Sequence, residues 1–199
     1  MVPHSPTDVP VDSWALIEAQ MRECYGRVVY THKTQEKCAD ILLARLSTIK
    51  VWQIILSAIT TAGFLAAILG SGPIGAIVGI VVSTALLALN TYTKNYDLGS
   101  IAQKHRQAAA DLWLVREEYL ALITDLRMRK DSIDKIVARR DILLKRLHEV
   151  YSGAPSTNYA AYRNAQIALQ KQEEMTFTDE EIDAFLPKVL RKCGRSDES

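Results

Sequence analysis

The chain has 199 residues, 48% of them hydrophobic, and a formal net charge of +1 at pH 7. A charge this close to zero gives no basic surface of the kind that nucleic-acid-binding domains use, so no nucleic-acid binding is expected. Outside the central region Gly and Pro are few, and β-branched and aromatic residues do not gather into short alternating runs, so the expected fold is all-α.

The first helical pattern begins at residue 13, and residues 1–12 before it are expected to be disordered. Over residues 13–50 apolar or small side chains recur at heptad-like positions, which predicts a cytoplasmic amphipathic helix. Thr31, Gln35 and Arg45 interrupt this stripe. Its members are Trp14, Ile17, Met21, Cys24, Val28, Cys38, Leu42 and Ile49.

No charged side chain occurs between Lys50 and Lys94, and a Gly-Ser-Gly-Pro sequence at positions 70–73 divides this run into two arms. At about 1.5 Å of rise per residue, arms 51–69 and 73–92 each match the roughly 30 Å of bilayer hydrocarbon. Core helices of soluble proteins rarely stay uncharged for this length, so we expect a two-helix transmembrane hairpin in the lipid bilayer. Lys and Arg flank both arms but not the turn, which predicts an inner (plasma) membrane protein with both termini cytoplasmic.

Small side chains repeat every four residues along each arm, a spacing that lets helix backbones approach closely in lipid. These faces either close the hairpin or contact another protomer of a homo-oligomer. The residues concerned are Ala58, Ala62 and Ala66 in the first arm, and Ser71, Gly75, Gly79 and Ser83 in or before the second.

Hydroxyl groups are the polar side chains found deep in the arms. They are candidates to line an aqueous path, because no charge inside the membrane marks an ion route. Two arms cannot enclose a channel, so a pore would require several chains. The candidate residues are Ser57, Thr60, Thr61, Ser83 and Thr84.

Residues 93–151 are expected to form one long cytoplasmic helix in coiled-coil-like packing, because alternating steps of four and three from Ile101 fall mostly on apolar residues. His105 is one of the exceptions, and Asp131-Ser132 could interrupt the helix. The segment that enters the membrane is the obvious partner, although the seam could also join protomers. The apolar seam positions are Ala108, Leu112, Val115, Tyr119, Leu122, Leu126, Ile133, Ile136, Leu143, Leu147 and Val150.

A linker is expected at residues 152–157, where Gly and Pro follow the long helix. A C-terminal helical segment over 158–191 and a disordered tail over 192–199 complete the chain. Within that segment Thr178 and Glu181 have the spacing of a capping box, which predicts the start of a short helix.

The sequence contains no pattern that indicates catalysis. The four histidines are scattered, and no pair has the spacing of a metal site or of an activated nucleophile, so no enzyme activity, metal or cofactor is expected. The glycines at positions 70, 72 and 75 match a dinucleotide-binding pattern, but that pattern needs a preceding strand, and these glycines lie at the tip of a membrane hairpin.

The order of these parts, together with Tyr162-Arg163-Asn164-Ala165 and the stretch from Phe177 to Pro187, resembles the SLATT family of bacterial two-transmembrane domains. The resemblance covers the chain from about Trp14 to Arg191. It implies a membrane effector of an antiviral or conflict system that forms or disturbs a pore when a nucleotide-synthesising or nucleotide-sensing partner is triggered. The alternative is a non-conducting membrane anchor or scaffold that docks a cytosolic enzyme.

Overall fold

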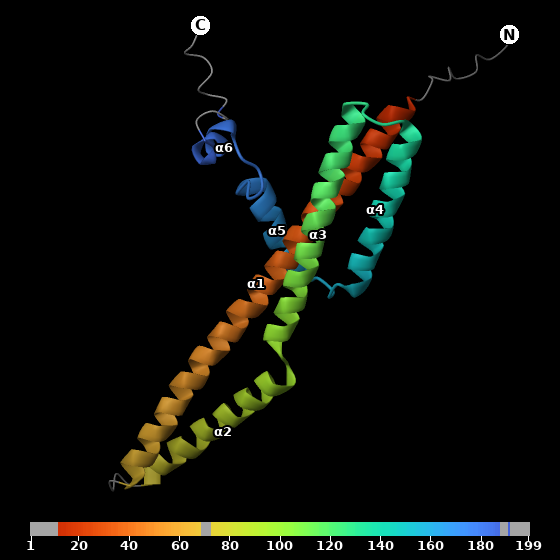
Figure 1. Ribbon diagram of the computed structural model, residues 1–199. Coiled ribbons are helices and arrows are strands. Elements are labelled where there is room, and N and C mark those ends of the chain that lie inside the picture. Colours follow the sequence, from red (N-terminus) through yellow and green to blue (C-terminus); the bar gives the residue numbers. More distant parts are fainter. Residues whose placement is uncertain (1–11, 69–72, 188–190, 192–199) are drawn as a thin grey trace, which may run out of the picture.

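The computed structural model describes residues 12–68, 73–187 and 191, which form six α-helices and no strand (Figure 1). The protein is therefore all-helical, as the sequence predicts. The disorder expected at both ends concerns residues outside this described part, apart from Asp12.

Helix α1 (Ser13–Ile68) is one continuous helix of 56 residues that contains both the amphipathic segment and the first arm. At 1.5 Å per residue it is about 84 Å long. Helix α2 (Pro73–Asn95) contains the second arm and runs back beside α1. In Figure 1 the C-terminal end of α1 and the start of α2 lie at one end of the molecule, while the N-terminal end of α1 lies at the other.

The prediction of one helix over residues 93–151 is wrong, because α2 continues to Asn95 and two further helices follow, α3 (Leu98–Arg127) and α4 (Ile133–Gly153). The interruption considered at Asp131-Ser132 is present, since α3 ends before these residues and Ser132 is the N-cap of α4. Helix α3 ends in a Schellman motif, in which the Lys130 N–H donates to Asp125 O and the Arg129 N–H to Leu126 O, both at 3.1 Å. Arg129 adopts the left-handed conformation with φ 47°. Its guanidinium lies 5.3 Å from the centre of the Trp14 ring, which helps to hold the turn in place.

Helices α1, α3 and α4 form a three-helix bundle, because the turn after α3 lets α4 fold back beside it (Figure 1). The apolar seam predicted from Ile101 onward is buried inside this bundle. The seam is therefore used within one chain and is not free to join protomers. The core residues of the three-helix bundle are Met21, Val28, Leu112, Val115, Tyr119, Leu122, Leu126, Ile136, Leu143 and Leu147.

Helix α5 (Tyr159–Lys171) packs on α1 through a stripe of small side chains, Ala161, Ala165 and Ala168, all of them buried. Helix α6 (Asp179–Phe185) is short and follows at the end far from the hairpin (Figure 1). The expected C-terminal helical segment is thus divided into two helices. The expected linker begins later than residue 152, because α4 continues to Gly153.

We expect Leu122→Ala to cost about 2–5 kcal/mol of unfolding free energy, because it empties a fully buried site of the bundle. Leu120→Ala in the same helix is the control: Leu120 is 44% exposed, so its truncation should cost less than about 1 kcal/mol. Denaturant unfolding of the detergent-solubilised protein, followed by circular dichroism, measures both. Equal losses, or a Leu122 effect that changes with protein concentration, would contradict a seam that is buried within one chain.

Candidate functional site

The two membrane arms approach each other closely at Gly63 of α1. A Cβ atom built on Gly63 would lie 3.5 Å from the Gly75 carbonyl oxygen and 3.6 Å from the Gly79 Cα of α2. These are ordinary van der Waals distances, so the backbone of α2 occupies the space where a longer side chain would go. Without a hydrophobic force between helices in lipid, such close packing is a main source of attraction between the arms.

The small residues named from the sequence divide between two surfaces. Gly79 is buried and Gly75 is half-buried against α1, so these two belong to the contact inside the hairpin. Ala66 is half-buried, and Ser71 lies outside the described residues. The residues of the set that remain exposed on the hairpin are Ala58, Ala62 and Ser83.

Gly63 was missed by the sequence analysis because the contact does not follow a four-residue spacing. The half-buried positions of the first arm recur in steps of three and four, as in a coiled-coil seam. They include Gln53, Leu56, Thr60, Gly63 and Ala67. Continuing the steps of four and three from the stripe before the arm reaches Leu56 and Gly63, but it gives the exposed Trp52 and Ile59 in place of Gln53 and Thr60.

The hydroxyl residues proposed to line a path lie mainly on the outside of the hairpin. Thr60 is half-buried, whereas Ser57, Thr61, Ser83 and Thr84 are exposed. Three threonine hydroxyls donate to the carbonyl oxygen four residues earlier: Thr60 to Leu56 (2.8 Å), Thr61 to Ser57 (3.0 Å) and Thr84 to Ile80 (2.9 Å). These bonds satisfy the hydroxyl protons, so the side chains can face lipid or another protomer at little cost.

A polar contact joins the arms at the end nearer the helix bundle. The Gln53 amide nitrogen donates to the Asn90 side-chain oxygen at 2.8 Å and to the Thr93 hydroxyl at 3.3 Å. An amide left unpaired inside the bilayer would cost several kcal/mol, so the three groups favour one pairing of the helices. We call Gln53, Asn90 and Thr93 the polar clamp; they were not among the candidate residues predicted from the sequence.

The two arms are connected to the three-helix bundle in different ways. Helix α1 passes from bundle to membrane without interruption, whereas α2 ends at Asn95 and α3 starts at Leu98 with a change of direction (Figure 1). The Asp97 carboxylate caps α3 by accepting from the Ser100 N–H at 2.9 Å. The second arm is therefore attached through a two-residue hinge, and the first is attached rigidly.

Buried polar groups connect the bundle to the segment between α4 and α5. His105 Nδ1 donates to the Gln35 side-chain oxygen at 2.5 Å, and the Gln35 amide donates to Pro155 O at 3.2 Å. Burial lowers the pKa of His105, so its imidazole is neutral at neutral pH. Together the two bonds fasten this connection to α1 and α3.

An ion-pair cluster fixes the segment after α5 against α1. Lys33 Nζ lies 2.6 Å from a Glu174 carboxylate oxygen and 2.9 Å from one of Glu36, and Lys37 lies 3.3 Å from Glu174. The hydrogen bond from Lys33 holds the pKa of the Glu174 carboxyl below its usual value. Burial acts to lower the pKa of Lys33, but its bonds to the two carboxylates outweigh burial and raise it.

Two adjoining grooves of about 460 and 520 Å³ lie between α1, α4 and α5. Both grooves are lined by Arg27 and Tyr151. The surface around them carries further tyrosines, which were not among the candidate residues predicted from the sequence. The rings of Tyr30 and Tyr162 are stacked with centroids 6.1 Å apart, and the Tyr151 hydroxyl donates to Thr31 at 3.1 Å. Aromatic and arginine side chains of this kind are enriched where proteins bind each other.

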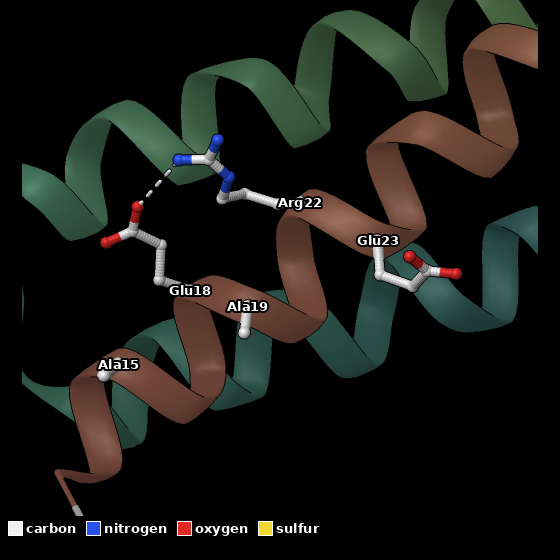
Figure 2. A pocket seen from close by; sticks show the side chains of 5 residues that line it. All are labelled: Ala15, Glu18, Ala19, Arg22 and Glu23. Carbon is white, nitrogen blue, oxygen red and sulfur yellow. Dashed lines mark hydrogen bonds and ion pairs between the residues drawn. The ribbon is translucent and has the colours of Figure 1, made fainter.

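A further hollow of about 450 Å³ lies on the face of α1 turned away from α3 and α4 (Figure 2). The Glu18 carboxylate accepts from Arg22 at 3.4 Å and from Arg127 of α3 at 2.8 Å, and the bond from Arg127 lowers the pKa of Glu18. Glu23 points away from this pair and binds Arg27 at 3.1 Å. The charged groups around the hollow are thus paired within the protein, which does not favour a ligand site there.

The capping box at the start of α6 is present in the structure. The Glu181 N–H donates to the Thr178 hydroxyl at 3.3 Å, and the Thr178 N–H donates to the Glu181 carboxylate at 2.8 Å. Among the described residues there is no group of three or more His, Cys, Asp or Glu that could hold a metal ion.

Comparison with known proteins gives one result that covers most of the chain. A family model described as the SMODS and SLOG-associating 2TM effector domain family 4 (SLATT family 4) matches residues 17–181. No curated protein and no solved structure matches the chain. The matched segment includes both arms, the three-helix bundle and the capping box.

We expect the contact at Gly63 to accommodate an alanine side chain but not a leucine side chain. Gly63→Ala places its methyl group in van der Waals contact and improves helix propensity by up to about 1 kcal/mol, so it should be neutral or stabilising. Gly63→Leu should separate the arms and cost about 1–3 kcal/mol. Unfolding in mixed detergent measures both, with Ala62→Leu at the exposed neighbouring position as the control. A Gly63→Leu protein as stable as wild type would exclude close approach at this position.

Loss of the capping box should loosen α6 alone. We expect Thr178→Ala to cost about 0.5–2 kcal/mol locally, because it removes the acceptor for the Glu181 N–H. Hydrogen exchange over residues 180–186 should become faster, with exchange in α3 unchanged. Glu181→Gln is the control, because glutamine also completes a capping box. Unchanged exchange in Thr178→Ala would mean that the cap does not stabilise this helix.

Proposed function

The chain belongs to the SLATT family, as a member of family 4 of the SMODS and SLOG-associating 2TM effector domains, and on that premise we propose that it oligomerises and opens or disturbs the membrane when a cytosolic partner is triggered. Membership implies a membrane effector in conflict systems. The pore, the oligomer and the trigger are our proposal, as is the absence of catalysis.

The observation that carries the proposal is the exposure of the hairpin. The most apolar windows of its two helices are only 0% and 6% buried, so neither is the core helix of a soluble fold. Ile54, Ile68 and Ile74 are each at least 70% exposed. Large aliphatic side chains in contact with water would be unfavourable along both arms, whereas contact with lipid is favourable.

The proposed oligomer uses the outer face of the first arm. Gly79 is buried and Gly75 is half-buried, so the exposed small residues Ala58 and Ala62 of the first arm are the surface that we propose for close approach between protomers. Ser57 and Thr61 lie one position before each of them along the same arm. Packing through the alanines would thus bring these two hydroxyls to the edge of the contact, where an aqueous path could form.

The proposed signal enters through the cytosolic bundle. The family description associates these domains with SMODS and SLOG proteins, so we propose a nucleotide-synthesising or nucleotide-sensing partner. The tyrosine and arginine grooves between α1, α4 and α5 are the proposed contact surface. Because α1 continues without a break into the membrane, a partner that shifts this surface would also shift the first arm.

The proposed topology has both termini in the cytoplasm and the hairpin in the inner membrane. The Lys and Arg residues that flank the arms support it. The start of α1 and helix α6 also lie at the end of the molecule opposite the C-terminal end of α1 and the start of α2, which supports one crossing and one return of the membrane (Figure 1).

Leakage from liposomes tests the proposal. Vesicles that contain the purified protein should release dye when the protein encoded beside it and that protein's trigger are added. Ala62→Leu should lose most of this release while folding normally, because its larger side chain blocks approach between protomers and leaves the hairpin contact intact. Ala62→Ser keeps the residue small and should leak like wild type.

Two outcomes of the leakage test would contradict parts of the proposed pore mechanism. Full leakage by Ala62→Leu would remove this face from the mechanism. A wild-type protein that binds its partner but never releases dye would favour the alternative function, a membrane scaffold that docks a cytosolic enzyme.

A further inference from the structure

The arms leave a groove between them at their cytosolic end. Its volume is about 500 Å³, and each of its two walls follows one helix for about 10 Å. The walls are almost wholly apolar and come from both arms. The lining residues are Ile49, Trp52 and Leu56 of α1, and Ala85, Ala88, Leu89 and Tyr92 of α2.

The rim of the groove has the composition of a membrane–water interface. Trp52 and Tyr92 are 54% and 45% exposed, and Tyr96 lies beside Tyr92 with ring centroids 5.0 Å apart. Trp and Tyr are enriched at the level of lipid headgroups, where an apolar ring and a polar group are both accommodated. The groove therefore opens at the depth where acyl chains begin.

Arg45 lies on α1 about one helical turn before Ile49, the first residue of α1 that lines the groove. Steps of four, three and four lead from Arg45 to Ile49, Trp52 and Leu56, so all four share one face of the helix. The guanidinium group belongs to the turn about 6 Å further toward the cytosol than Ile49. This is the side of the groove where a headgroup phosphate would lie.

The charge of Arg45 is not compensated within the described part of the protein. Its side chain is exposed, and no ion pair of Arg45 occurs among the described residues. No Asp or Glu lies between Asp40 and Asp97 in the sequence; Asp40 pairs with Arg106 at 2.7 Å, and Asp97 caps α3. A free guanidinium group matches the geometry of a phosphate diester and binds it through two parallel hydrogen bonds.

We propose that the groove and Arg45 together bind one anionic phospholipid, with an acyl chain between the arms and the phosphate on the Arg45 guanidinium group. Lys50 and Lys94, which border the arms, add attraction for a headgroup of net negative charge. The site needs only the hairpin in a bilayer, so it holds whether or not the protein forms a pore.

Fluorescence quenching by brominated lipids tests the site, because Trp52 lines the groove. Trp14→Phe and Trp113→Phe remove the other two tryptophans and leave Trp52 as the reporter. The full-length protein is placed in vesicles that contain brominated phosphatidylglycerol or brominated phosphatidylcholine at equal mole fractions. We expect phosphatidylglycerol to quench Trp52 with about fivefold higher apparent affinity.

Three variants separate the two parts of the site. Arg45→Gln should abolish the preference for phosphatidylglycerol, whereas Arg45→Lys should retain much of it. Ala88→Leu should abolish the preference without any change of charge, because its side chain fills the groove. Arg163→Gln is the matched control: it removes an exposed arginine of α5 and should leave the preference unchanged.

Three results would overturn the proposal. Equal quenching by the two lipids in wild type would show non-specific boundary lipid only. A preference that survives Arg45→Gln or Ala88→Leu would place the lipid elsewhere. Absence of quenching by either lipid would show that a second copy of the protein covers the groove.

Discussion

Lipid offers no hydrogen-bond partner to a backbone amide, so the N–H and C=O groups of the two arms have to be paired within their own helices. This constraint requires the arm of α1 to be an unbroken helix, and α1 is indeed continuous from Ser13 to Ile68. The arms hold together by contacts that suit an apolar solvent: backbone approach at Gly63 and the polar clamp near the helix bundle. Between those two contacts, the sizes of the facing side chains set the distance between the arms.

The half of the molecule that contains the three-helix bundle is stabilised differently, by the removal of apolar side chains from water. Its three-helix core excludes water from residues such as Val115 and Tyr119, both fully buried. The Tyr119 hydroxyl lies in the same core, and burial raises its pKa to about 12, so the side chain remains neutral. Helix α5 has a thinner contact of three alanines, supplemented by the partly buried ion-pair cluster around Glu174. Local opening in this half should therefore begin at α5 and α6 rather than in the bundle.

The sequence was sufficient for the features that depend on long patterns. A charge-free run of this length gave the hairpin, and the steps of four and three from Ile101 gave the buried face of α3 and α4. The place of the turn between them was indicated by Asp131-Ser132, but its form was less predictable, because a helix end of this kind usually has Gly or Asn where this chain has Arg129. Gly63 and the polar clamp depend on which face of one arm meets the other, and that orientation follows from the crossing of two helices rather than from either helix alone.

The uninterrupted path of α1 has a mechanical consequence. A stiff helix that is held in the bundle turns as a lever, and the membrane arm extends about 28 Å from its cytosolic boundary to the tip. A tilt of about 10° at that boundary would carry the tip sideways by about 5 Å, roughly the rise of one helical turn. The hinge at Tyr96 and Asp97 allows α2 to follow without bending α3. A rotation small enough to leave the packing of the bundle unchanged would thus be amplified to a displacement of half a helix diameter in the membrane.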